Sequence, residues 1–312
     1  MTPRVVEATA NATMANLGVG FDILGMALTE PFDTVRAERS PERGVQIAAI
    51  TGDEGKLSRD PTRNTAGIAA AYVLRQIGAT EGVLLSLQKG LPLASGLGSS
   101  AASAVAAAVA VNALFGEPLS RADLLAASLE GEAVVSGRHA DNVAPALFGG
   151  ITLVMGLTAD AIHPLPVPPN LHLVLATPAI AVPTAEARAV LPANVPLKAL
   201  ISQTAHVALL VRALHTGDIG LLGAAMEGDG IIEPARAHLM RGLPEVRAAA
   251  RAYGAAGTLI SGAGPTLCSV CERADSAARV AAAVHAIYAE LGLAASVRVT
   301  VPAAQGAAWR AV

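Results

Sequence analysis

The chain is expected to be an α+β protein built from two mixed domains. Its 312 residues suffice for two medium-sized domains, and strand-like and helix-like segments occur in both halves. Neither half shows the strict β-α-β-α alternation of a doubly wound parallel sheet. Hydrophobic residues make up 53% of the chain but aromatic residues only 3%, so small aliphatic side chains must form the core, chiefly where helices pack on sheets.

The first half is expected to form a sheet with helices. Short apolar runs predict strands and longer apolar stretches predict helices. The predicted strands span residues 4–8, 33–38, 44–50, 82–88 and 149–156, and the predicted helices span 65–78, the apolar part of 92–116, and 120–133. Ser120, with Asp123 three residues later, is typical of a helix cap.

A proline-rich connection divides the chain. Residues 157–170 contain four prolines and read as an exposed linker, so the predicted domains are residues 1–160 and 161–312. The second domain is expected to mix antiparallel strands and helices. Its predicted strands span residues 171–177, 257–261, 266–272 and 296–301, and its predicted helices span 184–191, 198–215, 218–227, 243–253 and 274–291.

Charge and targeting signals predict a cytoplasmic protein. The formal net charge is −3 and the basic residues are scattered, which argues against nucleic acid as a partner. The first 14 residues lack the pattern of a signal peptide. The apolar run between Ser103 and Phe115 is shorter than the ~20 residues of a membrane span and is interrupted by Asn112, so no membrane segment is expected there.

The two cysteines form a C-x-x-C sequence within a predicted strand. Such a pair can belong to a zinc site or a redox motif, but the chain has no second C-x-x-C and no spaced histidine pair. Cys268 and Cys271 are therefore expected to be structural, and a reducing compartment is the default.

The stretch PLASGLGSSAA (residues 92–102) predicts an anion-binding loop at the start of a helix. Gly96 and Gly98 let the backbone approach a ligand, and the free N–H groups of the following helix attract an anion. An ordinary serine-capped helix is the structural alternative. The Walker lysine is absent, because Ser99 follows the last glycine. The dinucleotide pattern is formally met by Gly96, Gly98 and Ala101, but no strand immediately precedes it.

Two further glycine-rich stretches lie far away in the sequence. Asn16, Gly18, Gly20 and Asp22 occupy a polar loop within residues 8–28, which on its own reads as a turn. SGAGPT at residues 261–266 is either a hairpin turn or a loop that presses against a ligand.

Together, the three stretches resemble the GHMP kinases, a family of small-molecule kinases. The resemblance covers nearly the whole chain and includes an N-terminal loop, a P-x-x-x-G-L-G-S-S-A phosphate loop and a C-terminal G-x-G-P turn. Within the family, the sequences NLGVGFD (16–22), SGRHADNVAP (136–145) and PTAEARAVLP (183–192) look most like the branch that phosphorylates L-homoserine, the homoserine kinases. The resemblance implies a first domain with a left-handed βαβ crossover, a ferredoxin-like second domain, and transfer of the ATP γ-phosphoryl group to the L-homoserine hydroxyl in threonine biosynthesis.

The resemblance also implies a set of substrate residues. L-homoserine is a zwitterion, and a guanidinium pairs well with its carboxylate. Arg188 and Arg236 would hold the carboxylate, Asp22 the ammonium, and Asn16 the hydroxyl. The other residues expected at the substrate are His139, Thr184 and Gly262, with Asp141 and Asn142 beside the reaction. We expect direct in-line attack by a hydroxyl that Asn16 orients, with Asp141 as the fallback base.

The nucleotide residues follow from the same resemblance. The loop expected to wrap the ATP phosphates consists of Pro92, Leu93, Ala94, Ser95, Gly96, Leu97, Gly98, Ser99, Ser100, Ala101 and Ala102. Ser100 and Glu132 would bind Mg²⁺, which takes few protein oxygens, although Glu130 lies only two residues before Glu132. Asn64 would lie near the adenine and Lys89 at the edge of that pocket.

Three rival functions stay open on the sequence. One is another GHMP kinase that acts on a sugar or a mevalonate-like alcohol. A second is a non-catalytic sensor of the same fold, which could have lost its metal ligands. The third is a dinucleotide-dependent dehydrogenase. The oligomeric state is also open, a homodimer being one option.

Overall fold

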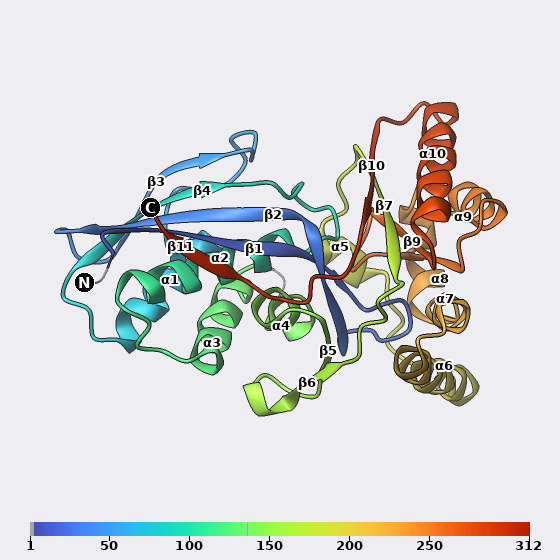
Figure 1. Cartoon of the computed structure of the whole chain (residues 1–312), viewed down its shortest axis with the longest axis horizontal. Coiled ribbons are helices and arrows are strands. Elements are labelled where there is room, and N and C mark those ends of the chain that lie inside the picture. The colour runs from blue at the N-terminus through green and yellow to red at the C-terminus, as the bar shows by residue number, and fades with distance from the viewer. Residues whose placement is uncertain (1–2, 136) are drawn as a thin grey trace.

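The computed structural model describes residues 3–135 and 137–312, and it contains two sheets, each packed with helices (Figure 1). Ser136, the first residue of SGRHADNVAP, lies outside the described residues. The α+β class predicted from the sequence is confirmed.

The first sheet has seven strands among the described residues. Its main path runs β11-β1-β2-β4-β3, with β5 paired to β2 and β6 paired to β5. All neighbours are antiparallel except β3 and β4, which are parallel and connected through helix α1. The strands are β1 (Val5–Ala15), β2 (Leu24–Ser40), β3 (Val45–Thr51), β4 (Gly82–Gln88), β5 (Ile151–Val154), β6 (Ile162–Leu165) and β11 (Ala308–Ala311).

Four helices lie along one face of this sheet (Figure 1). They are α1 (Thr65–Gln76), α2 (Ser99–Leu114), α3 (Arg121–Glu132) and α4 (Ala140–Phe148). The predicted cap of α3 is present as a full capping box between Ser120 and Asp123. Every residue of α2 from Ala101 to Leu114 is buried, and its alanine and valine side chains let the helix pack closely on β1, β2, α1 and α3.

The second sheet is antiparallel and has the strand order β10-β7-β9-β8. Numbered along the chain within this sheet, the order is 4-1-3-2, and helices join the first and second strands and the third and fourth, as in a ferredoxin-like unit. The ferredoxin-like architecture expected for the second domain is thus confirmed. Its elements are β7 (His172–Pro178), α5 (Thr184–Ala189), α6 (Leu197–Thr216), α7 (Ile219–Met226), α8 (Ile232–Arg236), α9 (Leu243–Ala252), β8 (Gly257–Ile260), β9 (Leu267–Cys271), α10 (Ala274–Glu290) and β10 (Ala295–Thr300).

Both faces of the second sheet are buried. Successive residues of β9 alternate between the large core that includes the first sheet and a smaller core under α9 and α10. Cys268 faces the first core and Cys271 the second, so the two thiols lie on opposite faces of one strand. Burial raises the pKa of both thiols, that of Cys271 to about 11. These features agree with the structural role predicted for the C-x-x-C sequence.

Two strands were not predicted, and both belong to the first sheet although they follow residue 160. The predicted linker 157–170 contains a short 3₁₀ helix (Ala159–Ala161) and strand β6, whose Pro164 is tolerated because β6 is an edge strand. Strand β11 pairs with β1 after the chain has completed the second sheet. The stretch expected to be an exposed linker therefore contains an edge strand that the sequence did not predict, because four residues carry little periodicity.

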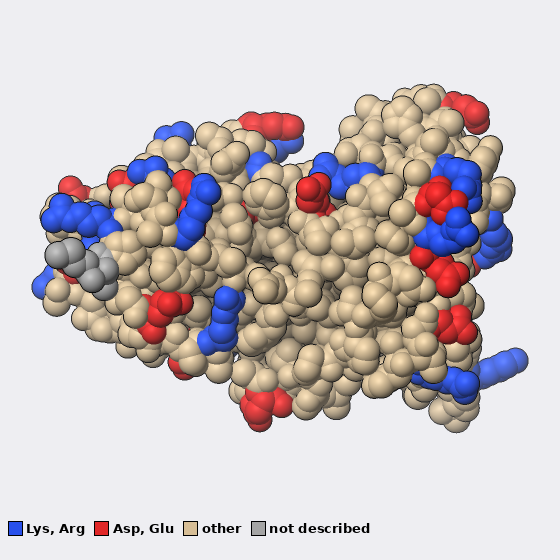
Figure 2. All heavy atoms as spheres, in the orientation of Figure 1, with Lys and Arg blue, Asp and Glu red and all other residues tan. Residues whose placement is uncertain are grey.

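Charged residues are interspersed on the face of the molecule shown in Figure 2. Basic side chains there are accompanied by acidic ones, and neither sign forms a continuous patch. Within the described part of the chain, α6 is the one helix long and apolar enough to cross a membrane by length and composition, and 22% of its most apolar window is buried. Helix α6 packs against α7, and its buried residues Leu210, Ala213 and Leu214 join the first core.

Candidate active site

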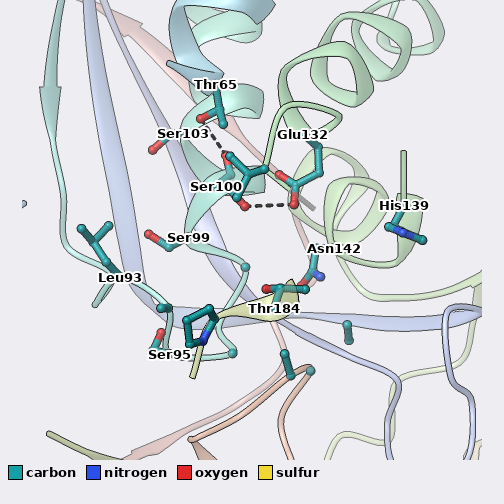
Figure 3. A pocket seen from close by; sticks show the side chains of 18 of the residues that line it. Thr65, Leu93, Ser95, Ser99, Ser100, Ser103, Glu132, His139, Asn142 and Thr184 are labelled. Carbon is teal, nitrogen blue, oxygen red and sulfur yellow. Dashed lines mark hydrogen bonds between the residues drawn. The ribbon is translucent and has the colours of Figure 1, made fainter. Parts of the chain in front are cut away.

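A pocket of about 380 Å³ lies between the two sheets and brings most of the predicted site residues together (Figure 3). It is lined by residues from the N-terminal loop, the phosphate loop, the ends of α3 and α4, helix α5 and the 261–266 turn. The predicted residues that line it are Asn16, Asp22, Asn64, Lys89, Leu93, Ala94, Ser95, Gly96, Gly98, Ser99, Ser100, Glu132, His139, Asp141, Asn142, Thr184, Arg188, Arg236 and Gly262. The remaining four, Pro92, Leu97, Ala101 and Ala102, are not among its lining residues.

The predicted phosphate loop ends at the N-terminus of α2. Gly98 is the N-cap, has a φ of 67°, and offers no side chain to the first N–H groups of the helix. A Cβ at Gly98 would lie 2.0 Å from the hydroxyl oxygen of Thr13, so only glycine fits there. A helix start without a side-chain cap, together with the dipole of the buried helix behind it, has the geometry that suits an anion.

The SGAGPT turn (residues 261–266) supports the phosphate loop through hydrogen bonds. It connects the antiparallel strands β8 and β9, as a hairpin turn would, and it also contacts the phosphate loop. The Ser261 hydroxyl donates to the Gly96 carbonyl at 2.8 Å, and the Thr266 N–H donates to the Ser95 carbonyl at 3.2 Å. The hairpin interpretation is therefore confirmed, and the contact of this turn with a ligand stays a prediction.

The side chains of Ser100 and Glu132 contact each other at the N-terminal end of α2. The Ser100 hydroxyl donates to Glu132 Oε1 at 2.9 Å, as Figure 3 shows, and the Glu132 residue is only 4% exposed. Glu130 instead forms an exposed ion pair with Arg138. A hydroxyl and a buried carboxylate beside an anion site are the oxygen donors that suit Mg²⁺. The geometry thus favours Glu132 over Glu130 as a metal ligand.

Lys89 lies in the pocket wall, but its charge is already neutralised within the protein. Its ammonium forms a buried ion pair with Asp33 and donates to the Ser103 hydroxyl and the Ser99 carbonyl at 2.7 and 2.9 Å. An ammonium has three protons, and these three contacts use them all. Lys89 thus lines the pocket, and its ammonium is already bound by groups of the protein.

Asp33 connects the two ends of the phosphate loop. One carboxylate oxygen binds Lys89, which follows β4, and Ser103, which lies in α2. The other oxygen accepts hydrogen bonds from the N–H groups of residues 90 and 91 at 2.9 and 3.1 Å. The entry to the loop and the helix after it are thus held by one buried side chain. We call Asp33, Lys89 and Ser103 the loop anchor.

Asn64 also has a structural task. It is the N-cap of α1: its carbonyl oxygen accepts the N–H groups of residues 66 and 67, and its amide donates to the Ser58 carbonyl at 2.9 Å. The residue is 5% exposed, so most of its polar surface is turned inward. Asn64 lines the pocket and also shapes the loop before α1, and its position near the adenine stays a prediction.

The other end of the pocket holds an ion pair. Arg188, on α5, donates to both carboxylate oxygens of Asp22 at 2.7 and 3.1 Å, and the His139 ring nitrogen Nδ1 lies 3.7 Å from the same carboxylate. Asn16, at a φ of 72°, accepts the Asp22 N–H and donates to the Gly262 carbonyl. These contacts fix the N-terminal loop against the second domain.

Arg236 is a buried cation beside this pair. Its guanidinium donates to the carbonyls of Ala187 and Gly262 at 2.9 and 3.0 Å, and the residue is 2% exposed. Among the residues that the structure describes, no carboxylate lies within 4.0 Å of it. Burial lowers its pKa, and the nearby Arg188 charge lowers it further. A buried, positively charged group of this kind favours an anionic ligand.

Phe21 is a site residue that the sequence analysis did not single out. Its ring lies 5.4 Å from the Arg188 guanidinium carbon and 5.3 Å from that of Arg236, within the range of a cation–π contact. One aromatic side chain thereby holds two like charges near each other. In a chain with four phenylalanines, an aromatic residue between Gly20 and Asp22 is the signal that could have identified it.

Asp141 and Asn142 lie at the start of α4. Asn142 accepts a hydrogen bond from the Thr13 hydroxyl at 2.7 Å, which places its side chain next to Gly98. Asp141 is 4% exposed, and its Oδ1 atom has no hydrogen-bond partner among the described residues. Burial, and secondarily the Asp22 charge, raises the pKa of Asp141 to about 7.

Asp141 should make the stability of the ligand-free protein depend on pH. Its folded pKa lies above the ordinary value, so its stabilising contribution is present when it is protonated and is lost as the pH rises through about 7. We expect Asp141→Asn to gain stability relative to the wild type between pH 5 and pH 8.5, by on the order of a few kcal/mol. Urea unfolding at both pH values measures this difference. Parallel pH profiles for the two proteins would contradict the prediction.

Comparison with known proteins identifies relatives along the whole chain. Residues 64–150 match the GHMP kinases N terminal domain and residues 210–290 match the GHMP kinases C terminal domain. A homoserine kinase from Chlorobium phaeobacteroides (strain BS1) is 41% identical to this chain, over 92% of this chain and 93% of the relative. A homoserine kinase from Arabidopsis thaliana is 44% identical, over 85% of this chain and 73% of the relative.

Solved structures agree. The crystal structure of homoserine kinase from Cytophaga hutchinsonii matches with a TM-score of 0.95 at 37% identity, over 99% of this chain and 98% of that one. The L. major mevalonate kinase in complex with R-mevalonate shares the fold, with a TM-score of 0.73 at 19% identity over 96% of each chain.

Proposed function

Since this chain belongs to the GHMP kinase family, we propose that it transfers the γ-phosphoryl group of ATP to the side-chain hydroxyl of L-homoserine. The product is O-phospho-L-homoserine, an intermediate of threonine biosynthesis. Relatives that carry this activity in their names align with nearly the whole chain.

The observation that carries the proposal is the charge arrangement at the substrate end of the pocket. Two guanidiniums and one carboxylate, those of Arg188, Arg236 and Asp22, lie together a short way from the anion site. A neutral sugar would not require two cations and an acid. A mevalonate-like acid would use the cations but not Asp22. An amino acid with a hydroxyl uses all three, with its carboxylate on the arginines and its ammonium on Asp22.

The nucleotide end supports the same reaction. The N–H groups at the start of α2 would bind the ATP phosphates, and Ser100 and Glu132 would hold Mg²⁺. When bound, the metal would supply neutralisation of phosphate charge. The loop anchor supports this arrangement by fixing both ends of the loop before the nucleotide arrives.

The residues between the two ends would orient and deprotonate the hydroxyl. Phosphoryl transfer depends mainly on positioning, and Asn16 is held rigidly enough to orient an attacking oxygen. Asp141 is the candidate acceptor for the hydroxyl proton, because a pKa of about 7 suits a base at neutral pH. The attacking oxygen forms the new bond to phosphorus as the bond to the β-phosphate oxygen breaks, and ADP leaves.

A coupled ADP assay against a panel of alcohols tests the function. The panel holds L-homoserine, galactose and mevalonate, each with ATP and Mg²⁺, and mass spectrometry identifies the product. We expect the highest kcat/KM with L-homoserine and a product heavier by one phosphoryl group. A higher kcat/KM with another alcohol would overturn the assignment of L-homoserine as the substrate. Binding of ATP and L-homoserine without ADP release would favour a non-catalytic sensor.

Removing the Arg236 charge should weaken L-homoserine binding. We expect Arg236→Met to raise KM for L-homoserine by roughly 10- to 100-fold, since a charge-assisted hydrogen bond is worth about 1.5–3 kcal/mol. The KM for ATP should change little. Arg241→Met is the matched control, because Arg241 is exposed and does not line the pocket. An equal loss for both substrates would indicate damage to the fold instead of a lost contact.

A further inference from the structure

The two side chains expected to bind opposite charges of the substrate are bound to each other in this structure. Arg188 donates two hydrogen bonds to Asp22, and both side chains are about one-third exposed, at 31% and 29%, at the pocket mouth. The bidentate geometry is the strongest arrangement that a guanidinium and a carboxylate can form. The two N–H groups and the two carboxylate oxygens that face each other are occupied while this ion pair lasts.

We propose that the Arg188–Asp22 pair is an internal substitute for the substrate zwitterion, and that L-homoserine binds by exchanging with it. This inference rests on the proposed function. The substrate ammonium takes the place of the Arg188 guanidinium on Asp22, and the substrate carboxylate takes the place of Asp22 on Arg188. One ion pair is thereby replaced by two, and no charge is left without a partner.

The contacts around the Arg188–Asp22 ion pair allow it to break while each residue keeps its place in the pocket. The Arg188 guanidinium rests against the Phe21 ring, which also contacts Arg236, so it keeps one neighbour after Asp22 is released. The Arg188 Nε atom is buried without a hydrogen-bond partner among the described residues. Asp22 is held through its backbone by Asn16. Each member of the pair is therefore fixed by contacts that do not involve the other.

The exchange makes selection for a zwitterion cooperative. A ligand with a carboxylate alone can take Arg188, but it leaves Asp22 without its cation and close enough to Asp141 to raise the pKa of that group. A ligand with an ammonium alone leaves Arg188 beside the positively charged Arg236. Only a ligand with both charges compensates both groups.

The first test measures binding of the substrate analogue that lacks the ammonium. Isothermal titration calorimetry with 4-hydroxybutanoate compares the wild type with Asp22→Asn, in which Arg188 loses its internal partner. We expect Asp22→Asn to bind this anion at least about tenfold more tightly, while it binds L-homoserine more weakly. Glu186→Gln is the matched control, because it removes an exposed acid from the same helix as Arg188. If both substitutions changed the affinity for 4-hydroxybutanoate equally, the loss of one negative charge would explain the result, and the exchange proposal would be overturned.

The second test is the reciprocal one. The analogue 3-aminopropan-1-ol lacks the carboxylate, and Arg188→Met releases Asp22 for its ammonium. We expect this variant to bind the amine at least about tenfold more tightly than the wild type, a gain that an unfolded pocket cannot produce. Unchanged or weaker binding in both tests would overturn the proposal. A wild type that exchanges as described but does not phosphorylate L-homoserine would instead overturn the proposed function alone.

Discussion

Replacing Lys89 with methionine is expected to lower the free energy of unfolding by about 3–5 kcal/mol, because it leaves the Asp33 carboxylate buried without its cation. Both side chains of this ion pair are only 1% exposed, so water cannot replace the lost partner. Urea unfolding followed by circular dichroism at pH 7 measures the loss. The same substitution should raise KM for ATP, since the anchor holds both ends of the phosphate loop.

Two further variants separate the buried charge from the lost side chain. Lys89→Met combined with Asp33→Asn removes both charges but keeps an oxygen for the N–H groups of residues 90 and 91, so it should recover most of the stability. Lys56→Met breaks an exposed ion pair with Glu54 and should cost less than about 1 kcal/mol. If the double variant were as unstable as Lys89→Met, the unpaired carboxylate would not be the cause.

Replacing Glu132 with glutamine is expected to reduce kcat by about 100-fold or more. The substitution keeps the size of the side chain and its acceptor for the Ser100 hydroxyl, but it removes the negative charge offered to Mg²⁺. Loss of a group that only supports a metal ligand typically costs about 10–100-fold, and a direct ligand should cost at least as much. The Mg²⁺ concentration for half-maximal activity should rise in parallel.

The neighbouring Glu130 provides the control for this experiment. It lies on the same helix, two residues earlier, and pairs with Arg138 at the surface. Glu130→Gln should keep kcat and the Mg²⁺ dependence within about twofold of the wild type, as expected of an exposed ion pair. A result in which Glu130→Gln is the inactive variant would reverse the assignment of the metal ligand.

Local patterns in the sequence predicted most of the fold. Strand β4, the cap of α3 and the buried helix α2 follow from short-range signals, namely alternation, a serine–aspartate pair and a long run of alanine and valine. The missed elements depend on distant partners. Strand β11 is exposed and only four residues long, and its pairing with β1 joins segments about three hundred residues apart.

The site was predictable as a set of residues but not as a set of contacts. Glycines and serines before an apolar helix indicated an anion site, and the resemblance added the acids and arginines. Nothing near Lys89 in the sequence reveals that its partner is Asp33, 56 residues away on β2. Asn64 was expected near the adenine, and the structure adds that it is the N-cap of α1. The hydrogen-bond partners of such inward-facing polar residues are therefore what the sequence does not reveal.

The pairing of β1 with β11 has a consequence for how fast this protein can fold. The first sheet reaches its final strand order only when residues near position 310 find residues near position 7. Contacts between such distant segments are slow to form, because chain entropy must be lost before they stabilise anything. Until then one edge of β1 is open to wrong partners, so refolding yield should depend strongly on protein concentration.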